Sequence, residues 1–279
     1  MTLSQSSIPE VRRPLVTVIL STYNWSEVLP YSIQSVLNQT FVDFELLVIG
    51  DGCTDNSAQV VQNFLDPRVR WINLPKNTGS QSGPNNEGLR QAKGSLIAYL
   101  GHDDLWSMDH LETLTSFCNN RNQVFATAAI IWLDDVCNVQ FISALNELII
   151  APMDANNWHT PSAIIHSHSL IEQVGLWIEH SPNQNINPDN EFFSRLDKIE
   201  PKKMVGSVSV AKVPAGWRKN IYQTRDVSPQ KSVFEQLISH PHILRDTAIA
   251  FFVKHFDRIE VLTPYYKDYE EYRHFKGLT

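Results

Sequence analysis

Cysteine is scarce in this sequence of 279 residues, and positive charge is in deficit. The three cysteines, Cys53, Cys118 and Cys137, are odd in number and form no C-x-x-C pair. The pattern therefore indicates neither a zinc site nor a disulfide framework, and it fits a reducing compartment. Lys and Arg total 23 against 30 Asp and Glu, which gives a net charge of −7. A chain without a basic footprint is not expected to bind nucleic acid.

Long hydrophobic runs are also missing. The longest mainly apolar stretch, Val124–Leu133, has about half of the ~20 residues that a membrane-spanning helix needs. Residues 1–14 are polar and lack the apolar centre of a signal peptide. We therefore expect a cytoplasmic protein without a transmembrane segment, which leaves open a peripheral position at the inner face of the membrane.

Short apolar runs in the first part of the chain predict buried strands. They are Leu15–Leu20, Phe44–Ile49, Val69–Leu74 and Ser95–Leu100. Most are continuous and rich in Val, Ile and Leu, as in strands that are covered on both faces. Helix-like stretches alternate with them at residues 26–38, 56–64 and 86–93. This order predicts an α/β fold with a mostly parallel sheet and right-handed crossovers.

After Trp106 the order of elements changes. The expected helices are residues 108–119, 188–196 and two stretches from 228 onward, and the expected strands are residues 124–133, 162–167 and 205–213. The last strand alternates weakly between apolar and polar residues, which favours antiparallel pairing. Ser228 and Pro229 are typical of a helix start. We therefore place a boundary after residue 226, between a main body and a helical C-terminal extension at 227–279.

Acidic residues follow two of the predicted strands, at the edge where parallel sheets bind ligands. In LIAYLGHDDLW, a buried strand ends in Asp103 and Asp104, and two adjacent carboxylates need positive charge beside them. Mn²⁺ or Mg²⁺ would supply it, because these ions prefer oxygen ligands and keep coordination positions open for phosphate oxygens. The alternative is that both acids cap the next helix.

Asp51 follows another predicted strand, in VIGDGCTDNS. Its carboxylate is placed to accept hydrogen bonds from a base or a ribose. The glycines on either side, Gly50 and Gly52, would let the backbone turn sharply. An ordinary Asp-Gly turn without a ligand is the alternative.

Two long segments match one family pattern in the right order. They are VTVILSTYNWSEVLPYSIQSVLNQTFVDFELLVIGDGCTDNS and NTGSQSGPNNEGLRQAKGSLIAYLGHDDLW. These segments resemble the N-terminal half of family 2 glycosyltransferases with the GT-A fold, and they are similar to the bacterial spore-coat type of nucleotide-sugar transferase. The resemblance runs from about Val16 to Trp106 and more thinly to about Arg195. It assigns residues 1–106 to a nucleotide-binding half and residues 107–226 to an acceptor-side half.

The resemblance implies an inverting, metal-dependent hexosyltransferase. The donor would be a nucleoside diphosphate sugar, with UDP favoured, and the acceptor a hydroxyl of a surface glycan or a lipid-linked sugar. The cofactor would be Mn²⁺ or Mg²⁺, held chiefly by Asp104 and also by Asp103, between the two phosphates of the donor. The nucleotide-binding residues that the resemblance implies are Ser21, Tyr23, Asp51, Asn86 and Asp103.

Four positions depart from the family pattern. Many members have an aspartate where this chain has Gly101, and another where it has Gly50. Asn85 stands where an arginine is common, and Pro188 replaces an acid. These departures keep open a second hypothesis, an inactive protein that binds a nucleotide sugar.

The candidate base lies in NPDNEFFSRL. An inverting transfer requires a carboxylate that takes the proton from the acceptor hydroxyl as this hydroxyl attacks the anomeric carbon. The resemblance places Asp189 in this role, with Glu191 as the alternative on the acceptor side. Asp189 is otherwise a stabilising acid in the first turn of a helix.

Two further segments are candidates for ligand contacts. Trp158 and His159 lie where the family has its acceptor-side loop, and a structural histidine is the alternative. In WRKNIYQTR, Arg218 and Lys219 are candidates for a basic loop that closes on the diphosphate, and a solvated basic turn is the alternative.

Two other functional classes are alternatives to the glycosyltransferase. A nucleotidyltransferase usually has a glycine-rich loop with a basic residue after its first strand, and STYNWSEVLP has neither. A non-catalytic interaction module would use the C-terminal helices, from Ser228, as its docking surface.

Overall fold

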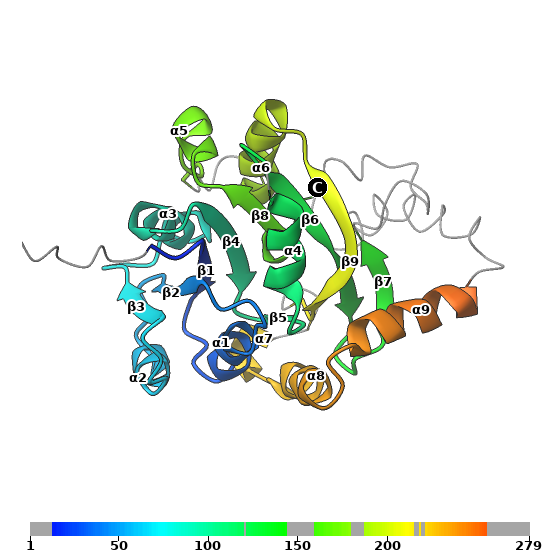
Figure 1. The fold of residues 1–279 in the computed structure, drawn as a ribbon. Coiled ribbons are helices and arrows are strands. Elements are labelled where there is room, and N and C mark those ends of the chain that lie inside the picture. Colours follow the sequence, from blue (N-terminus) through cyan, green and yellow to red (C-terminus); the bar gives the residue numbers. More distant parts are fainter. Residues whose placement is uncertain are drawn as a thin grey trace, which may run out of the picture.

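The protein is described by a computed structural model over residues 13–119, 121–143, 159–179, 187–214, 218 and 221–255. Within these residues nine strands form one sheet, which helices flank (Figure 1). The order of strands across the sheet is β3 (Val69–Asn73), β2 (Phe44–Gly50), β1 (Val16–Thr22), β4 (Leu96–Gly101), β8 (Ile164–Ser167), β6 (Phe125–Leu133), β9 (Lys203–Lys212) and β5 (Asp104–Trp106). The ninth strand, β7 (Val139–Ser143), pairs with β6 off this path.

The sheet has a parallel part and a mixed part. Strands β3, β2, β1 and β4 are parallel, whereas β8 runs antiparallel to both β4 and β6. Strand β9 is parallel to β6 and antiparallel to β5. The predicted α/β fold with a mostly parallel N-terminal sheet is therefore confirmed. The antiparallel pairing expected for residues 205–213 holds on the β5 side and is wrong on the β6 side.

Helices connect and cover the strands. They are α1 (Leu29–Leu37), α2 (Ser57–Gln62), α3 (Ser82–Gln91), α4 (His110–Cys118), the 3-10 helix η2 (Pro161–Ala163), α5 (Leu170–Val174), α6 (Pro188–Ile199), α7 (Ile221–Thr224), α8 (Ser228–Ser239) and α9 (Ile243–His255). Helix α3 begins at Ser82, four positions before the predicted start. Pro84 lies in the first turn of α3, where proline is tolerated.

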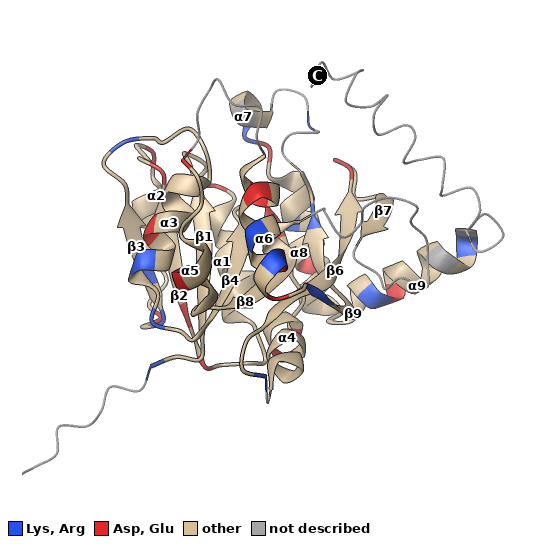
Figure 2. Ribbon diagram, turned by 90° about the horizontal axis from the view of Figure 1, so that it is seen from above, with Lys and Arg blue, Asp and Glu red and all other residues tan. Residues whose placement is uncertain are grey.

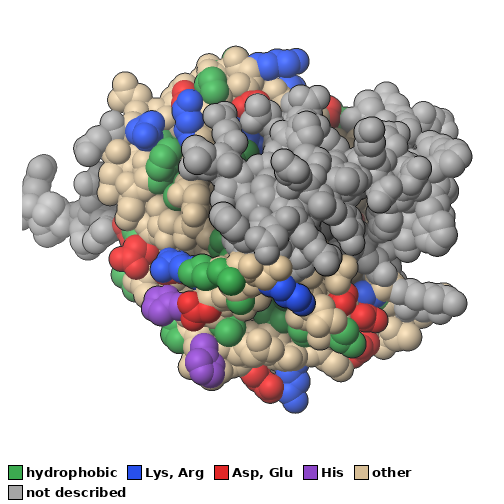
Figure 3. Space-filling view, turned by 90° about the vertical axis from the view of Figure 1, so that its right-hand side faces the viewer, with side chains coloured by type: hydrophobic (Ala, Val, Ile, Leu, Met, Phe, Trp, Pro, Cys, Tyr) green, Lys and Arg blue, Asp and Glu red, His purple; other side chains and the backbone are tan. Residues whose placement is uncertain are grey.

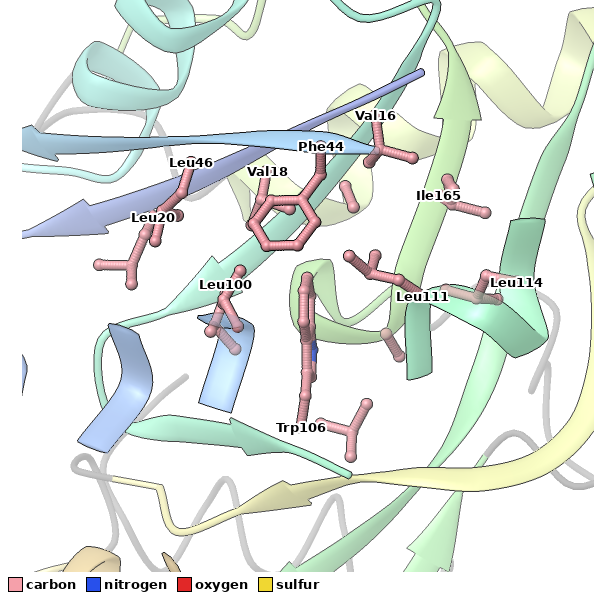
Figure 4. Packing of buried hydrophobic residues seen from close by; sticks show 14 of the residues in the cluster. Val16, Val18, Leu20, Phe44, Leu46, Leu100, Trp106, Leu111, Leu114 and Ile165 are labelled. Atoms are coloured by element: carbon pink, nitrogen blue, oxygen red, sulfur yellow. The ribbon is translucent and has the colours of Figure 1, made fainter. Parts of the chain in front are cut away.

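Alternate side chains of the inner strands enter cores on opposite faces of the sheet, because successive side chains of a strand point in opposite directions. On one face, Val18 and Leu20 pack with Phe44, Trp106 and Leu111 beneath α1 and α4 (Figure 4). This two-sided burial explains why the strand sequences are continuously apolar.

The opposite face of the sheet carries an aromatic core. Ile19 of β1 belongs to it, together with Tyr99, Trp177 and the adjacent Phe192 and Phe193 of α6. The rings of Trp177 and Phe192 stack with centroids 4.5 Å apart. Since Phe192 and Phe193 are fully buried, this core fixes the position of α6 and hence of its first turn.

The C-terminal helices pack on the same sheet. Val233 and Leu237 of α8 and Leu244 of α9 share a buried cluster with Leu105 of β5 and Ala211 of β9. Among the described helices none combines the length and the apolar character needed to cross a membrane. The boundary after residue 226 remains a proposal.

The described surface is mixed in charge. Acidic and basic residues alternate over the elements, and the described part shows no basic stripe (Figure 2). On the face in Figure 3, apolar side chains occur in small groups between charged and histidine side chains. The surface therefore offers no extended basic face to a polyanion.

Candidate active site

The carboxyl ends of β1, β2 and β4 bring the predicted nucleotide-binding residues to one edge of the sheet. Ser21 pairs in register with Ile49 of β2 and with Gly101 of β4. The backbone N–H of Asp51 donates to the Thr22 carbonyl at 2.8 Å. Residues 80 positions apart in the chain thus meet, and Thr22 Oγ1 lies 3.0 Å from His102 Nδ1.

Asp51 is a buried, anchored carboxylate. Its Oδ1 accepts hydrogen bonds from the backbone N–H and the hydroxyl of Thr78, at 3.0 and 2.8 Å. Gly52 follows with φ +70°, and a Cβ there would lie 2.4 Å from the Asn77 nitrogen. Asp51 is thus part of an Asp-Gly turn and is also a carboxylate that Thr78 holds in place.

Tyr23 is the exposed aromatic residue of this edge, with 42% of its surface accessible. Asn24, next to it, has φ 44°, and its side-chain oxygen accepts from the Thr54 N–H at 2.8 Å. The loop after β1 is therefore fixed to the loop after β2, and it holds Tyr23 outward. An exposed ring at this place has the accessibility that stacking on a base requires.

Lys212 provides the positive charge that the adjacent aspartates need. Asp104 of β5 and Lys212 of β9 are register partners, and Lys212 Nζ lies 2.6 Å from Asp104 Oδ2. The hydroxyl of Ser162 also donates to Oδ2 and accepts from the Gly101 N–H at 3.0 Å. Burial raises the pKa of Asp104 to about 6, against the opposing effect of the Lys212 ammonium. The helix-cap alternative is wrong for Asp104, which lies in a strand and is fully buried.

The other carboxylate oxygen of Asp104, Oδ1, differs from Oδ2 in its hydrogen bonding. Oδ1 is buried and has no hydrogen-bond partner within the described residues. A Cβ added to Gly101 would lie 3.0 Å from Asp104 Oδ2 and 3.3 Å from Asp103 Oδ1, so the glycine keeps space beside both acids. No group of three or more His, Cys, Asp or Glu side chains in the described ranges is arranged to hold a metal. A cation here would depend on Oδ1 of Asp104 and on oxygens of the ligand.

Asp189 lies in the first turn of α6, as predicted. Asn187 caps this helix, because its side-chain oxygen accepts from the Asp189 N–H at 2.9 Å. Gln81, which precedes α3, donates its side-chain amide to Asp189 Oδ1. Burial raises the pKa of Asp189 to about 7, and the charge of Lys212 and the Gln81 hydrogen bond oppose this rise. The environment of Asp189 therefore includes the cation that binds Asp104, and its pKa suits a general base near neutral pH.

Two arginines gather around Trp25, beside the acidic pair. The guanidinium carbons of Arg218 and Arg225 lie 5.5 and 5.8 Å from the Trp25 ring, and the His102 ring meets the same indole at 5.3 Å. Burial lowers the pKa of His102, Asp103 opposes this effect, and the charges of Arg225, Lys212 and Arg218 lower it further. Three cations therefore act on His102, the residue before the two aspartates.

Comparison with known proteins identifies the family. A family model described as glycosyl transferase family 2 matches residues 17–141. An uncharacterized glycosyltransferase from Haemophilus influenzae is 37% identical, over 76% of this chain and 89% of that relative. The chain belongs to glycosyltransferase family 2. The resemblance seen in the sequence is thus confirmed.

Better-described relatives match part of their length. The teichuronic acid biosynthesis glycosyltransferase TuaG of Bacillus subtilis, itself named as putative in that function, is 31% identical over 41% of this chain and 46% of TuaG. The Escherichia coli enzyme WfgD, named UDP-Glc:alpha-D-GlcNAc-diphosphoundecaprenol beta-1,3-glucosyltransferase, is 36% identical over 40% of this chain and 44% of its own. This family 2 chain thus spans less than half the length of these two relatives.

Solved structures share the fold of this family 2 chain. Staphylococcus aureus TarS, in complex with UDP-GlcNAc, superposes with a TM-score of 0.61 at 18% identity, over 71% of this chain and 58% of the other. A mannosyltransferase from Pyrobaculum calidifontis, in complex with GDP-Man and Mn²⁺, gives 0.56 at 14% identity, over 96% and 84%. The predicted GT-A fold is confirmed by these neighbours.

Two predicted site residues of the family 2 chain, Asn86 and His159, have structural partners instead of an open position. Asn86 is 4% exposed and holds the Trp177 backbone through both amide atoms, at 2.9 and 2.8 Å. His159 is 2% exposed and stacks on Phe125, with centroids 5.8 Å apart. These contacts favour the structural alternative for His159, and a nucleotide-binding role of Asn86 remains a prediction.

Glu191 and the basic loop are further predictions on the acceptor and diphosphate sides. Glu191 pairs through both oxygens with Arg195, one turn later, at 2.8 and 2.9 Å. Arg218 donates to the Asp226 carbonyl at 3.0 Å, which ties it to the segment before α8. Trp158 and Lys219 lie outside the described residues.

Sequence reasoning missed residues that complete the site. Lys212, Gln81, Thr78 and Ser162 all contact a predicted acid. For Lys212 a signal existed, since it interrupts the apolar run VSVAKVP of a predicted strand. A lysine inside such a run predicts a buried partner of opposite charge.

Proposed function

We propose that this chain transfers a sugar from a UDP-sugar to a hydroxyl of a glycan or lipid-linked acceptor, with inversion. The observation that carries the proposal is the position of Asp189 in the first turn of α6, where Gln81 donates to it and where the charge of Lys212, which binds Asp104, acts on it. TarS, with 18% identity, was solved with UDP-GlcNAc, and WfgD is named for a UDP-Glc donor and a diphosphoundecaprenol acceptor. These names support UDP as the nucleotide of the donor and a lipid-linked sugar as the acceptor.

The proposed step is a single displacement. The acceptor oxygen bonds to the anomeric carbon while the bond from this carbon to the β-phosphate oxygen breaks. Asp189 takes the acceptor proton, and UDP leaves with the electron pair. Asp51 and Tyr23 hold the base, and Arg218 lies on the diphosphate side. The hydrogen bond from Gln81 and the half-buried position of Asp189 support its role as the base for the acceptor hydroxyl.

A divalent cation, Mn²⁺ or Mg²⁺, is part of the proposal. The unpartnered Oδ1 of Asp104 suits one bond to a hard cation, and phosphate oxygens would complete the set. When bound, the ion would neutralise charge on the departing diphosphate. Gly50 and Gly101 provide no further carboxylate, so the protein offers few ligands of its own.

The test combines binding with turnover. Calorimetric titration of UDP in Mn²⁺ should show binding to the wild type and, with equal affinity, to Asp189→Asn. Release of UDP from UDP-sugars should fall about 10²- to 10⁴-fold in Asp189→Asn, the usual contribution of a general base. Asp135→Asn, at an exposed aspartate of the β6–β7 turn, is the matched control and should equal the wild type.

Two outcomes would contradict the transferase. If UDP, GDP and dTDP all fail to bind, the nucleotide site itself is refuted. If UDP binds but no UDP-sugar is turned over by the wild type, the inactive nucleotide-sugar-binding protein is the correct interpretation, and the substitutions at Gly50, Gly101 and Pro188 explain it.

A further inference from the structure

Lys212 sits where the donor diphosphate is expected. We propose that Lys212 is a built-in counter-ion of the diphosphate site, which lets the chain keep its affinity for a nucleoside diphosphate when the divalent cation of the proposed function is removed. The inference rests on the proposed function, since it assumes that the edge formed by β1, β2 and β4 binds the donor. In this inference Lys212 of β9 supplies positive charge to the diphosphate, which otherwise only a metal ion on the acidic motif would supply.

The position of the ammonium is set by backbone pairing on both sides. Lys212 is the register partner of Asp104 on β5 and of Trp132 on β6. Its Nζ lies 2.6 Å from Asp104 Oδ2 and 5.6 Å from the Trp132 ring. Two strands therefore hold the lysine, and a charge held in advance costs little reorganisation when a ligand binds.

The ammonium of Lys212 remains partly accessible. The side chain keeps 20% of its surface exposed, whereas Asp104 has none. An ammonium has three N–H donors, and the bond to Asp104 uses one of them. Lys212 can therefore reach an anion while it neutralises the carboxylate that would repel this anion.

The neighbouring residues favour a cation over another acid. A Cβ at Gly101 would lie 3.0 Å from Asp104 Oδ2, the same oxygen that Lys212 binds. The glycine thus leaves open the space beside this ion pair. Arg218 and Arg225, both near Trp25, add positive charge at the same strand end. Three cations that act on His102, the residue before Asp103, thus add positive charge near the proposed diphosphate site.

A purely structural ion pair is the competing explanation. Asp104 is fully buried, so Lys212 could serve only to neutralise it during folding. This explanation predicts that loss of Lys212 weakens the whole protein, with no selectivity between ligands. The proposal predicts that loss of Lys212 weakens the binding of UDP and leaves the binding of uridine, which lacks the diphosphate, unchanged.

The experiment is calorimetric titration of UDP and of uridine, in EDTA and in Mn²⁺. The wild type should bind UDP in EDTA within about tenfold of its affinity in Mn²⁺. Lys212→Met should lose about 10- to 100-fold in UDP affinity in EDTA, as expected for a charge-assisted hydrogen bond, and keep its uridine affinity. Lys212→Arg should retain most of the UDP affinity. Lys203→Met, at the exposed other end of β9, is the matched control.

Each outcome separates this inference from the proposed function. If the wild type binds no UDP even in Mn²⁺, the proposed function fails. If it binds UDP in Mn²⁺ but loses it in EDTA, the proposed function stands and the role of Lys212 is refuted. Equal UDP affinities of Lys212→Met and the wild type in EDTA would refute it as well.

A second variant tests whether a folding defect, and not the missing charge, causes the loss of UDP binding. Removing Lys212 alone leaves Asp104 as an uncompensated buried charge, which is strongly destabilising. The double variant Asp104→Asn, Lys212→Met removes both charges, so it should fold and bind uridine. In EDTA it should lose UDP binding as the single variant does, and retention of UDP binding would overturn the inference.

Discussion

The side-chain amide of Gln81 donates a hydrogen bond to Oδ1 of Asp189, which joins the residue before α3 to the first turn of α6. The two residues are 108 positions apart. The bond favours the ionised carboxylate and opposes the effect of burial, which raises the net pKa of Asp189 to about 7. Gln81 therefore orients the proposed base and keeps it able to accept a proton.

Replacing Gln81 should move the pH dependence of transfer. A base must be ionised, so kcat/KM of the wild type should fall about tenfold per pH unit below a limb near pH 7. In Gln81→Leu the pKa of Asp189 rises, and the limb should move to higher pH while UDP affinity is unchanged. Gln91→Leu, at an exposed position of α3, should leave the pH of this limb unchanged. A loss of activity that is uniform over pH would show a role in positioning alone.

The two glycines that replace family aspartates should respond differently to substitution. At Gly50 a Cβ would lie 2.5 Å from both Asn73 Oδ1 and Trp71 Cη2. Gly50→Ala should therefore lower the free energy of unfolding by about 1–3 kcal/mol through overpacking against Trp71. Gly101→Ala meets the two aspartates at 3.0 and 3.3 Å, so it should change stability less and UDP affinity more. Urea unfolding and UDP titration of the pair give both readouts, and equal stability losses would refute the distinction.

Thr78 should matter for nucleotide binding through Asp51. Thr78→Val removes the hydroxyl that donates to Asp51 Oδ1 at 2.8 Å and keeps the backbone bond at 3.0 Å. The free energy of unfolding should fall by about 1 kcal/mol, and uridine affinity should fall severalfold because the carboxylate loses one anchor. Thr113→Val on α4 is the control for the same substitution, and its uridine affinity should be that of the wild type. Unchanged uridine affinity in Thr78→Val would argue that Asp51 does not touch the nucleotide.

Sequence order predicted the edge of the sheet well because local patterns determine it. The ends of β1, β2 and β4 follow from their apolar runs, and parallel pairing then brings Ser21, Asp51 and Gly101 together. Asp189 was placed in a first helical turn because the predicted helix begins at residue 188 and the family motif opens a helix there, and α6 begins at Pro188. These inferences needed no knowledge of distant contacts.

The contacts of the site could not be predicted from the sequence, because they depend on registers between distant strands. Lys212 meets Asp104 through the pairing of β9 with β5, 108 positions apart, and a three-residue strand such as β5 has no periodicity to detect. His159 was ambiguous for a different reason. Its neighbours in the chain give no apolar periodicity, whereas Phe125 and Phe193, which pack against it, come from other elements.

Buried histidines should make the fold sensitive to mild acid. Burial lowers the pKa of His110 to about 3, that of His159 to about 3 and that of His166 to about 4, against 6.5 ordinarily. In the unfolded chain these histidines bind protons below pH 6.5, which the folded protein does not. Their contribution to stability is therefore complete above pH 6.5 and is lost as the pH falls below it, by about 1.4 kcal/mol per pH unit for each histidine.

The slope of stability against pH isolates one histidine from the rest. Asp104 and Asp189, with raised pKa values, act in the opposite sense, since the folded protein takes up their protons first as the pH falls. Urea unfolding between pH 7 and 5 should therefore compare the wild type with His110→Asn, whose side chain can keep a hydrogen bond to Ser209. The variant is less stable at pH 7, but its slope below pH 6 should be smaller by one proton, about 1.4 kcal/mol per pH unit. His240→Asn, at an exposed histidine, should keep the wild-type slope. An unchanged slope in His110→Asn would mean that the folded protein also protonates His110. The burial of the His110 ring, which stacks on Trp106, would then be contradicted.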